Sequence, residues 1–350
     1  MIAGSTYRIG IVGASSIAGK ELSEALAESA LAASDIVLLD EDDAGQVTTA
    51  GDEVSFIQKL DADSFAGMDF VFFAGGAEIT KKYWKTARQA GASIVDMTYA
   101  LEAEPGVVVR GPWTGVAAGG RDAHAQELNL TTPAVVAAHP AALMLLLVAS
   151  RIHTKFPVQA VSATVFEPAS EHGREAMDEL HQQTVSLLSF QSLPREQYDA
   201  QVAFNLLPSL GDAAKVKLAA TKQRIVDHYD LLAAGAAPEL ALQLAQAPVF
   251  HGYVASVLIE LREPLTVEQV ELAAYGAHVD LVARESDPPS NLSAAGQPDI
   301  LLRVSPAAAG EGPARRFWLW LAADNLKLAA LNAIACASEL GRLRPQGKVQ

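Results

Sequence analysis

The sequence is poor in the residues that build covalent or metal-linked frameworks. It holds one cysteine, Cys336, among 350 residues, which excludes an intrachain disulfide framework and any zinc site made of several cysteines. Basic residues are also scarce, since 26 Lys and Arg face 41 Asp and Glu for a formal net charge of −15. Such a surface repels phosphate backbones and anionic lipids, so we expect neither nucleic acid nor a membrane surface as a partner.

Long hydrophobic runs are lacking too. The most apolar stretch, residues 133–148, is interrupted by His139 and Pro140, whereas a helix needs about 20 apolar residues to cross a bilayer. We therefore expect a buried strand followed by a buried helix in this stretch. The first residues lack the basic and then apolar pattern of a secretory signal, so a cytoplasmic protein is expected. The length favours two domains.

The first part of the chain alternates short apolar strands with helical segments. The expected strands are 7–13, 35–39, 68–73 and 92–96, and the expected helices are 19–31 and 81–90. This alternation predicts an α/β fold in which a parallel sheet is covered by helices on both faces.

The pattern changes near Pro133 toward long strands grouped with helices, which predicts an α+β domain. The expected strands are 160–166, 249–261 and 317–321, and the expected helices are 140–152, 171–190, 267–275 and 324–343. Three segments rich in Gly, Pro, Ala and Ser are expected to be loops, namely 45–53, 288–298 and 306–313.

A glycine turn joins the first strand to the first helix, with glycines at 10, 13 and 19 and a serine at 16. This turn is typical of a Rossmann-type dinucleotide fold, in which the backbone approaches the pyrophosphate at a helix N-terminus. The side chain at position 16 either crowds the phosphates or donates a hydrogen bond to them. The candidate cofactor-binding residues are Gly10, Gly13, Ser15, Ser16, Ile17, Asp40 and Gly75.

Four carboxylates, Asp40 to Asp43, follow the second strand, where an adenine ribose would lie. Asp40 is suited to accept from ribose hydroxyls, which favours NAD, whereas the 2′-phosphate of NADP would be repelled. The alternative is a solvated acidic loop without a cofactor.

Several segments resemble aspartate-semialdehyde dehydrogenases, in the same order along nearly the whole chain. They are 10–19 (GIVGASSIAG, like GxxGATGxVG), 73–76 (FAGG, like SAGG), 204–208 (FNLLP, like FNxxP), 248–250 (PVF) and 323–333, which is similar to DNLRKGAALNA. The resemblance implies an N-terminal Rossmann-type domain at 1–135, completed by the C-terminal helix 324–345, and a second catalytic and dimerisation domain at 136–323. It further implies a homodimer and, for the family, an NADP-dependent semialdehyde dehydrogenase.

The resemblance also assigns the family's reactive side chains to positions in this chain, and none carries the family residue. The position of the attacking cysteine reads Ala142, within His-Pro-Ala-Ala-Leu. The positioning glutamine reads Glu167, and the acid/base histidine reads Tyr253. The two substrate-binding arginines read Gln246 and Glu102.

We therefore predict a homologue without the thiol-dependent reaction, non-catalytic or repurposed, similar to paralogues of this family that lack the cysteine. Cys336 is expected to be a small buried hydrophobe. Two alternatives stay open. One is a structural or regulatory partner that forms a hetero-oligomer with another enzyme. The other is an oxidoreductase with thiol-independent chemistry in the same cleft, built from Glu167, Tyr253, His251, His139 and Glu102. No metal is expected, since His172 and His181 lack a helical ligand spacing.

Overall fold

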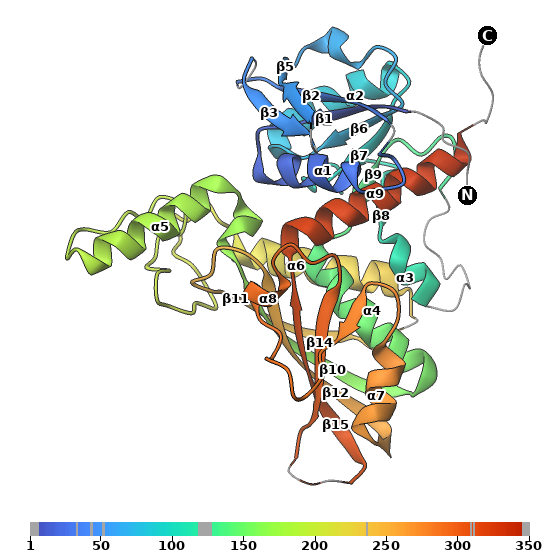
Figure 1. Cartoon of the computed structure of the whole chain (residues 1–350), viewed down its shortest axis with the longest axis vertical. Coiled ribbons are helices and arrows are strands. Elements are labelled where there is room, and N and C mark those ends of the chain that lie inside the picture. The colour runs from blue at the N-terminus through green and yellow to red at the C-terminus, as the bar shows by residue number, and fades with distance from the viewer. Residues whose placement is uncertain are drawn as a thin grey trace. The chain divides into compact units, whose positions relative to one another are not determined.

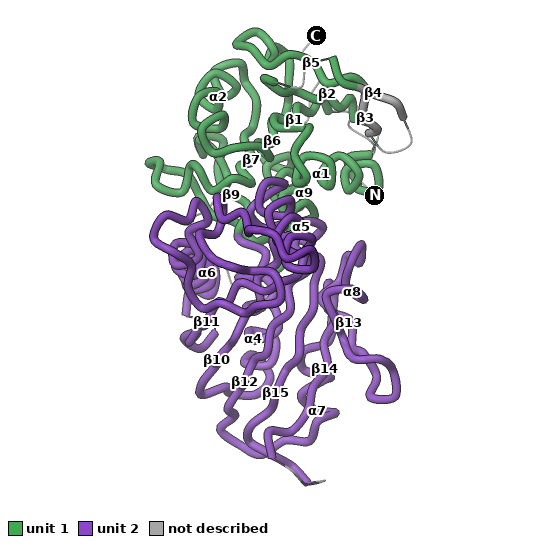
Figure 2. Tube along the Cα trace, turned by 90° about the vertical axis from the view of Figure 1, so that its left-hand side faces the viewer, with its two compact units in different colours: residues 1–113, 124–138, 329–350 green, residues 114–123, 139–328 purple. Residues whose placement is uncertain are grey.

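The structure, a computed structural model, describes residues 7–344 except 33, 43–44, 51–52, 118–127, 236, 309 and 311. Asp43, one of the four carboxylates considered above, lies outside the described residues. The chain divides into two compact units (Figure 2). Unit 1 comprises residues 1–113, 124–138 and 329–350, and unit 2 comprises residues 114–123 and 139–328.

Unit 1 is built on a seven-stranded sheet in the order β5-β2-β1-β6-β7-β9-β8, and every strand pair in it is parallel. Its strands are β1 (Arg8–Val12), β2 (Asp35–Asp40), β5 (Gln58–Lys59), β6 (Phe70–Phe73), β7 (Ser93–Asp96), β8 (Val108–Arg110) and β9 (Val135–Ala137). Their near-continuous apolar runs are typical of strands that are buried on both faces.

Helices cover both faces of this sheet (Figure 1). The helices of unit 1 are α1 (Ile17–Ala27), α2 (Ala77–Gln89), the 3-10 turn η1 (Ala62–Phe65) and the part of α9 (Asn325–Leu343) from Ala329 onward. Phe70 and Phe72 pack on the same side as α1 and α9, whereas Val71 and Phe73 pack on the other side, with Trp84 of α2. The two-residue period of β6 therefore supplies two separate cores.

Unit 2 is built on a six-stranded mixed sheet in the order β11-β10-β12-β15-β14-β13. Its strands are β10 (Val158–Glu167), β11 (Leu240–Gln246), β12 (Tyr253–Leu265), β13 (Val279–Leu281), β14 (Ile300–Pro306) and β15 (Ala314–Ala323). The outer pairs β10–β11 and β13–β14 are parallel, and the central pairs are antiparallel. Phe317, Leu319 and Leu321 of β15 point into the core, while the alternate residues Trp318 and Trp320 are 42% and 38% exposed.

The helices of unit 2 gather beside this sheet, and α5 projects from one end of it (Figure 1). They are α4 (Pro140–Lys155), the 3-10 turn η2 (Ala169–His172), α5 (Arg174–Leu188), α6 (Leu218–Ala233), α7 (Val267–Ala274) and α8 (Asn291–Ala294), with α3 (Pro112–Ala117) at the boundary between the units. Twelve of the sixteen residues of α4 are buried, which explains why its sequence is apolar on all sides.

The predicted fold class is confirmed, because a parallel α/β unit precedes an α+β unit with a mixed sheet. Two loop predictions are wrong. Segment 45–53 contains β3 (Val47–Ala50) and the start of β4 (Glu53–Phe56), which pair as a hairpin, and segment 288–298 contains α8. Among the described residues, none of the helices combines the length and hydropathy needed to cross a membrane.

Candidate functional site

The first turn of α4 carries Ala142, at the position predicted for the attacking thiol. His139 caps this helix, because its Nδ1 accepts a hydrogen bond of 3.2 Å from the amide of Ala141, and Pro140 occupies the first helical position. The Ala142 side chain is fully buried. A methyl group at this place offers no nucleophilic atom.

His139 is also the first member of a buried polar cluster in unit 2. Its backbone amide donates to Nδ1 of His228 at 2.9 Å. Since Nδ1 of His139 accepts from Ala141, the proton of the neutral ring lies on Nε2, which is 3.1 Å from Oε1 of Glu171. The helix cap thus fixes both the orientation and the tautomer of His139.

Glu171 is the centre of this cluster. Its Oε2 accepts a hydrogen bond of 3.3 Å from Nδ2 of Asn325, and the fully buried Tyr253 ring packs at a centroid distance of 6.1 Å from His139. Burial alone would raise the pKa of Glu171, but the hydrogen bonds from His139 and Tyr253 and the charge of His172 outweigh it and lower the pKa of this carboxyl. Glu171 is therefore an ionised carboxylate that is surrounded by hydrogen-bond donors.

Asn325 ties this carboxylate to two more segments. Its Oδ1 accepts from Ser170 Oγ at 3.0 Å and from the Gly252 amide at 3.1 Å. The side chain is 1% exposed. Its amide thus joins η2, the start of β12 and the start of α9 in one hydrogen-bonded network.

Glu167 and Gln246 end the neighbouring parallel strands β10 and β11, where they are register partners. Oε2 of Glu167 lies 2.9 Å from Nε2 of His172. Gln246 donates through Nε2 to the carbonyls of Glu167 and Ala247, each at 3.1 Å. Both side chains are almost completely buried, so they hold the strand ends together and face no open solvent.

His172 is held in its charged form by this arrangement. Burial alone would lower the pKa of His172, but the adjacent Glu167 carboxylate, with a contribution from Glu171, raises the pKa above its ordinary value. The structure thus places Glu167, His139 and Tyr253 in the same unit. It adds Glu171 and Asn325, which the sequence reasoning did not assign to the site.

Three other predicted residues make different contacts. Glu102 belongs to unit 1, where its charge adds to burial in raising the pKa of Asp96. His251 contributes its backbone carbonyl, which accepts from Asn291 Nδ2 at 3.3 Å. Cys336 is fully buried in α9, and burial first, then the charge of Glu339, strongly raises the pKa of its thiol.

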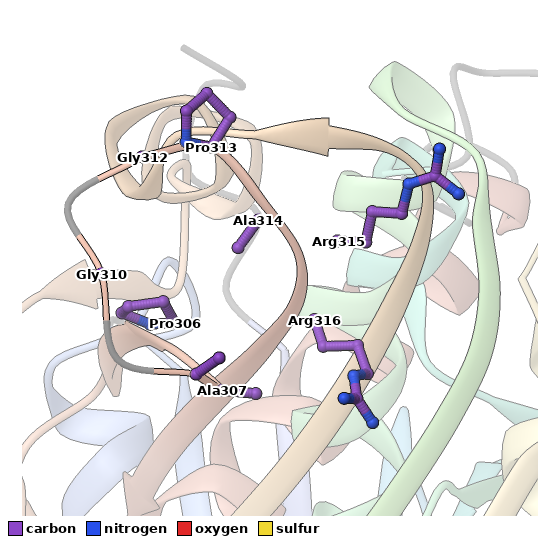
Figure 3. Close-up of a pocket in the computed structure, with 9 residues that line it drawn as sticks. Pro306, Ala307, Gly310, Gly312, Pro313, Ala314, Arg315 and Arg316 are labelled. Carbon is purple, nitrogen blue, oxygen red and sulfur yellow. The ribbon is translucent and has the colours of Figure 1, made fainter.

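A cavity of about 340 Å³ lies at the hairpin between β14 and β15 (Figure 3). It is lined by Pro306, Ala307, Ala308, Gly310, Gly312, Pro313, Ala314, Arg315 and Arg316. Since Pro306 pairs with Phe317 and Tyr253 pairs with Ala323, the cavity is at the opposite end of the sheet from the polar cluster. In the described part of the chain, no three His, Cys, Asp or Glu side chains gather as a metal site requires.

The glycine turn of unit 1 is tightly packed. Gly13 has a positive φ of 83°, and a Cβ on it would lie 2.3 Å from Cα of Gly75. A Cβ on Gly19 would lie 2.3 Å from the carbonyl oxygen of Gly13, and one on Gly10 would lie 2.5 Å from Sδ of Met68. Gly13 and Gly19 require glycine because backbone atoms of neighbouring segments approach too closely for any side chain, whereas the contact at Gly10 is with the flexible end of Met68.

The two serines of the turn bind to their own chain. Ser15 donates to Oδ2 of Asp40 through its hydroxyl at 2.6 Å and through its amide at 3.2 Å. The hydroxyl of Ser16 accepts from the Gly19 amide at 2.9 Å and donates to the carbonyl of Ala74 at 2.8 Å. Ser16 is therefore the N-cap of α1.

Two family models together match most of the chain. The model described as semialdehyde dehydrogenase, NAD binding domain, matches residues 8–139, and the one described as semialdehyde dehydrogenase, dimerisation domain, matches residues 150–327. The chain belongs to the semialdehyde dehydrogenase family. The resemblance inferred from the motifs is thereby confirmed at the level of the family.

Similar proteins agree with this assignment. A USG-1 protein homolog of Pseudomonas aeruginosa is 30% identical over 82% of this chain and 84% of its own length. An aspartate-semialdehyde dehydrogenase of Rickettsia bellii is 26% identical over 95% of this chain and 97% of its own. The crystal structure of a probable aspartate-semialdehyde dehydrogenase from Pseudomonas aeruginosa is 27% identical, with a TM-score of 0.81 over 96% of this chain and 98% of that one.

The name of the first family model implies a dinucleotide, and the residues of this semialdehyde dehydrogenase homologue fit it poorly. Asp40, the residue predicted to accept from a ribose, is 7% exposed and already accepts from Ser15 and from the Glu41 amide at 2.9 Å. Ser16 stands where relatives of this motif carry glycine, and its hydroxyl occupies the first turn of α1. Gly10, Gly13 and Gly75 serve the close packing of the turn, and Ile17 begins α1.

Proposed function

We propose that this chain is a semialdehyde dehydrogenase homologue that does not carry out the thiol-dependent reaction of its family. Supporting this, the predicted thiol position holds the buried methyl group of Ala142, at the start of a helix that His139 caps. The chain's one cysteine lies in α9 of unit 1, where the pKa of the thiol is strongly raised. A thiol in that state is protonated at neutral pH and is a poor nucleophile.

The other predicted reactive positions support the same proposal. The fully buried Tyr253 packs with His139 around the ionised Glu171, and Glu167 is paired with His172. A general acid or base must reach the proton that it transfers. Side chains committed to one another in a buried cluster serve the stability of unit 2 instead.

A steady-state assay with aspartate semialdehyde, phosphate and NADP tests this proposal, with an active family member as the positive control. Loss of a nucleophile and its paired base costs on the order of 10⁴–10⁶ in rate, so we expect turnover below about 10⁻⁴ of the control. The variant Ala142→Cys should remain at this level, because restoring the sulfur does not restore the base. Turnover of the wild-type protein within about tenfold of the control would overturn the proposal.

The chain carries the dimerisation domain of its family, and we propose that it forms a homodimer through the open face of the unit 2 sheet. Trp318 and Trp320 lie on this face, where they pair in register with Leu258 and Ser256 of β12. Two half-exposed tryptophans beside each other are costly in water and common at interfaces. A second copy of the same face would bury them.

Light scattering on the purified chain tests the proposed homodimer. The wild-type protein should have twice the mass of one chain, and Trp318→Glu with Trp320→Glu should have the mass of one. Leu272→Glu, at a residue of α7 that is 69% exposed, is the control and should stay dimeric. A dimer that survives the tryptophan changes would place the interface elsewhere.

A further inference from the structure

The carboxyl edge of the unit 1 sheet has the topology of a ligand crevice. β1 lies between β2 and β6, and the chain leaves β1 toward α1 and β6 toward α2, which cover opposite faces. In open parallel sheets, ligands bind at such a switch point, outside the carboxyl ends of the strands. What lies there decides whether this homologue takes up a dinucleotide.

The acidic residue of the crevice is already occupied. Asp40 ends β2, and its carboxylate receives three donors from its own chain: the hydroxyl and amide of Ser15 on Oδ2, and the amide of Glu41 on Oδ1. A carboxylate offers about four acceptor positions. With 7% of Asp40 exposed, little of it is left for two ribose hydroxyls.

The helix that would face the pyrophosphate is capped internally. Ser16 satisfies the Gly19 amide and ties the turn to Ala74, at the end of β6. In the described part of the chain, the first-turn amides of Ile17 and Ala18 have no acceptor. Ser16 therefore satisfies one first-turn amide of α1 and leaves the others at this N-terminus unsatisfied.

A charged bridge joins the segment after β2 to α2. Oε1 of Glu41, directly after β2, lies 2.6 Å from Nζ of Lys82 and accepts from the Tyr83 hydroxyl at 2.8 Å. Both partners are on α2, which follows β6. Since β1 lies between β2 and β6 in the sheet, the bridge links the two segments that flank β1. The hydrogen bonds from Lys82 and Tyr83 lower the pKa of Glu41, so the bridge stays charged at neutral pH.

We propose that these side chains close the crevice of unit 1 to NAD and NADP, so that a dinucleotide fold is kept without its dinucleotide. Three contacts act together: Ser15 occupies Asp40, Ser16 caps α1, and Glu41 joins β2 to α2. This proposal is independent of the missing thiol, because a homologue can lose its nucleophile and still bind a cofactor.

Isothermal titration calorimetry of the full chain with NAD, NADH, NADP and NADPH tests the closure. The wild-type protein should show no saturable heat for any of the four, which corresponds to a Kd weaker than about 1 mM. The combined variant Ser15→Ala, Ser16→Gly and Glu41→Ala removes the hydroxyl donor of Asp40 and the side-chain cap of α1, and it releases Lys82. It should bind at least one dinucleotide, about tenfold more tightly or better.

If the combined variant fails to fold, Glu41→Ala alone tests the proposal. The Glu41 side chain is 28% exposed, so its loss leaves the core intact. Glu41→Ala should increase the affinity for a dinucleotide measurably, but by less than the combined variant. The matched control is Glu78→Ala, which removes an exposed carboxylate paired with Lys81 on the same helix at 3.3 Å, and it should give none. Micromolar binding by the wild-type chain overturns the proposal, and so does a set of folded variants that bind no better than it does.

Discussion

The two units differ in the partners that satisfy the polar side chains near the ends of their strands. In unit 2, Glu171 and Glu167 are buried carboxylates that pair with the imidazoles of His139 and His172. In unit 1, Asp40 is satisfied by neutral donors of a tight turn, and Glu41 forms a bridge on the surface. Buried polar clusters make a unit sensitive to the loss of one partner, whereas close backbone packing makes it sensitive to added atoms. We therefore expect unit 2 to be destabilised most by substitutions that remove a polar partner, and unit 1 by substitutions that add atoms.

The largest effect should come from removing a carboxylate in unit 2. Glu171→Ala leaves the Nε2 proton of His139 and the amide of Asn325 without their acceptor, which should lower the free energy of unfolding by about 2–5 kcal/mol at about 1–3 kcal/mol for each unsatisfied donor. Urea unfolding followed by tryptophan fluorescence measures it. Glu175→Ala, at an exposed position on the first turn of α5, is the control and should cost about 0.5 kcal/mol or less. Equal effects of the two changes would show that the cluster contributes little.

The second effect should come from adding one methyl group in unit 1. Gly13→Ala combines an unfavourable positive φ with a Cβ 2.3 Å from Gly75, so it should cost about 2–4 kcal/mol. Gly91 has a φ of 98° and open space around it, and Gly91→Ala separates the two causes because it should cost only about 1–2 kcal/mol. Hydrogen exchange should assign the loss to the strands of unit 1. If Gly13→Ala and Gly91→Ala lower the free energy of unfolding equally, close packing at the turn does not explain the loss of stability.

The smallest effect should be a pH dependence confined to unit 2. The raised pKa of His172 means that the folded state binds its proton more tightly than the unfolded state, whose pKa is about 6.5. Its stabilising contribution is complete below about pH 6.5 and is lost as the pH rises through the folded pKa. His172→Gln should flatten this decline between pH 6 and 9, which urea unfolding at each pH measures. His181→Gln, at an exposed position of α5, should leave the decline of stability with pH unchanged. If His172→Gln declined as steeply as the wild-type protein, His172 would not be the group responsible.

The sequence predicts the architecture better than the site because the fold depends on local periodicity. The apolar runs of β1, β2 and β6 and the stripe of α1 are visible over four to eleven residues. By contrast, the short β3–β4 hairpin has no alternating apolar pattern in Val47–Ala50, so it reads as a loop.

The site depends on partners that lie far apart along the chain. Ser15 and Asp40 are 25 residues apart, and Glu171 and Asn325 are 154 apart. No spacing in the sequence tells whether a serine hydroxyl binds a ligand or its own chain. The resemblance points to positions 142, 167, 246 and 253, but only the fold shows that Glu171 and Asn325 complete the cluster. One signal was available, since Glu171 and His172 follow Glu167 by four and five residues.

Intact-mass spectrometry after mixing the protein with aspartyl phosphate tests whether this chain has a thiol that attacks the family's substrate. An attacking thiolate displaces phosphate and leaves an aspartyl group on the enzyme, which raises its mass until hydride or water removes that group. With a methyl group at Ala142 and a buried, protonated Cys336, the mass of this chain should stay unchanged while an active family member gains the adduct. A stoichiometric aspartyl adduct on this chain, released by hydroxylamine, would contradict the account.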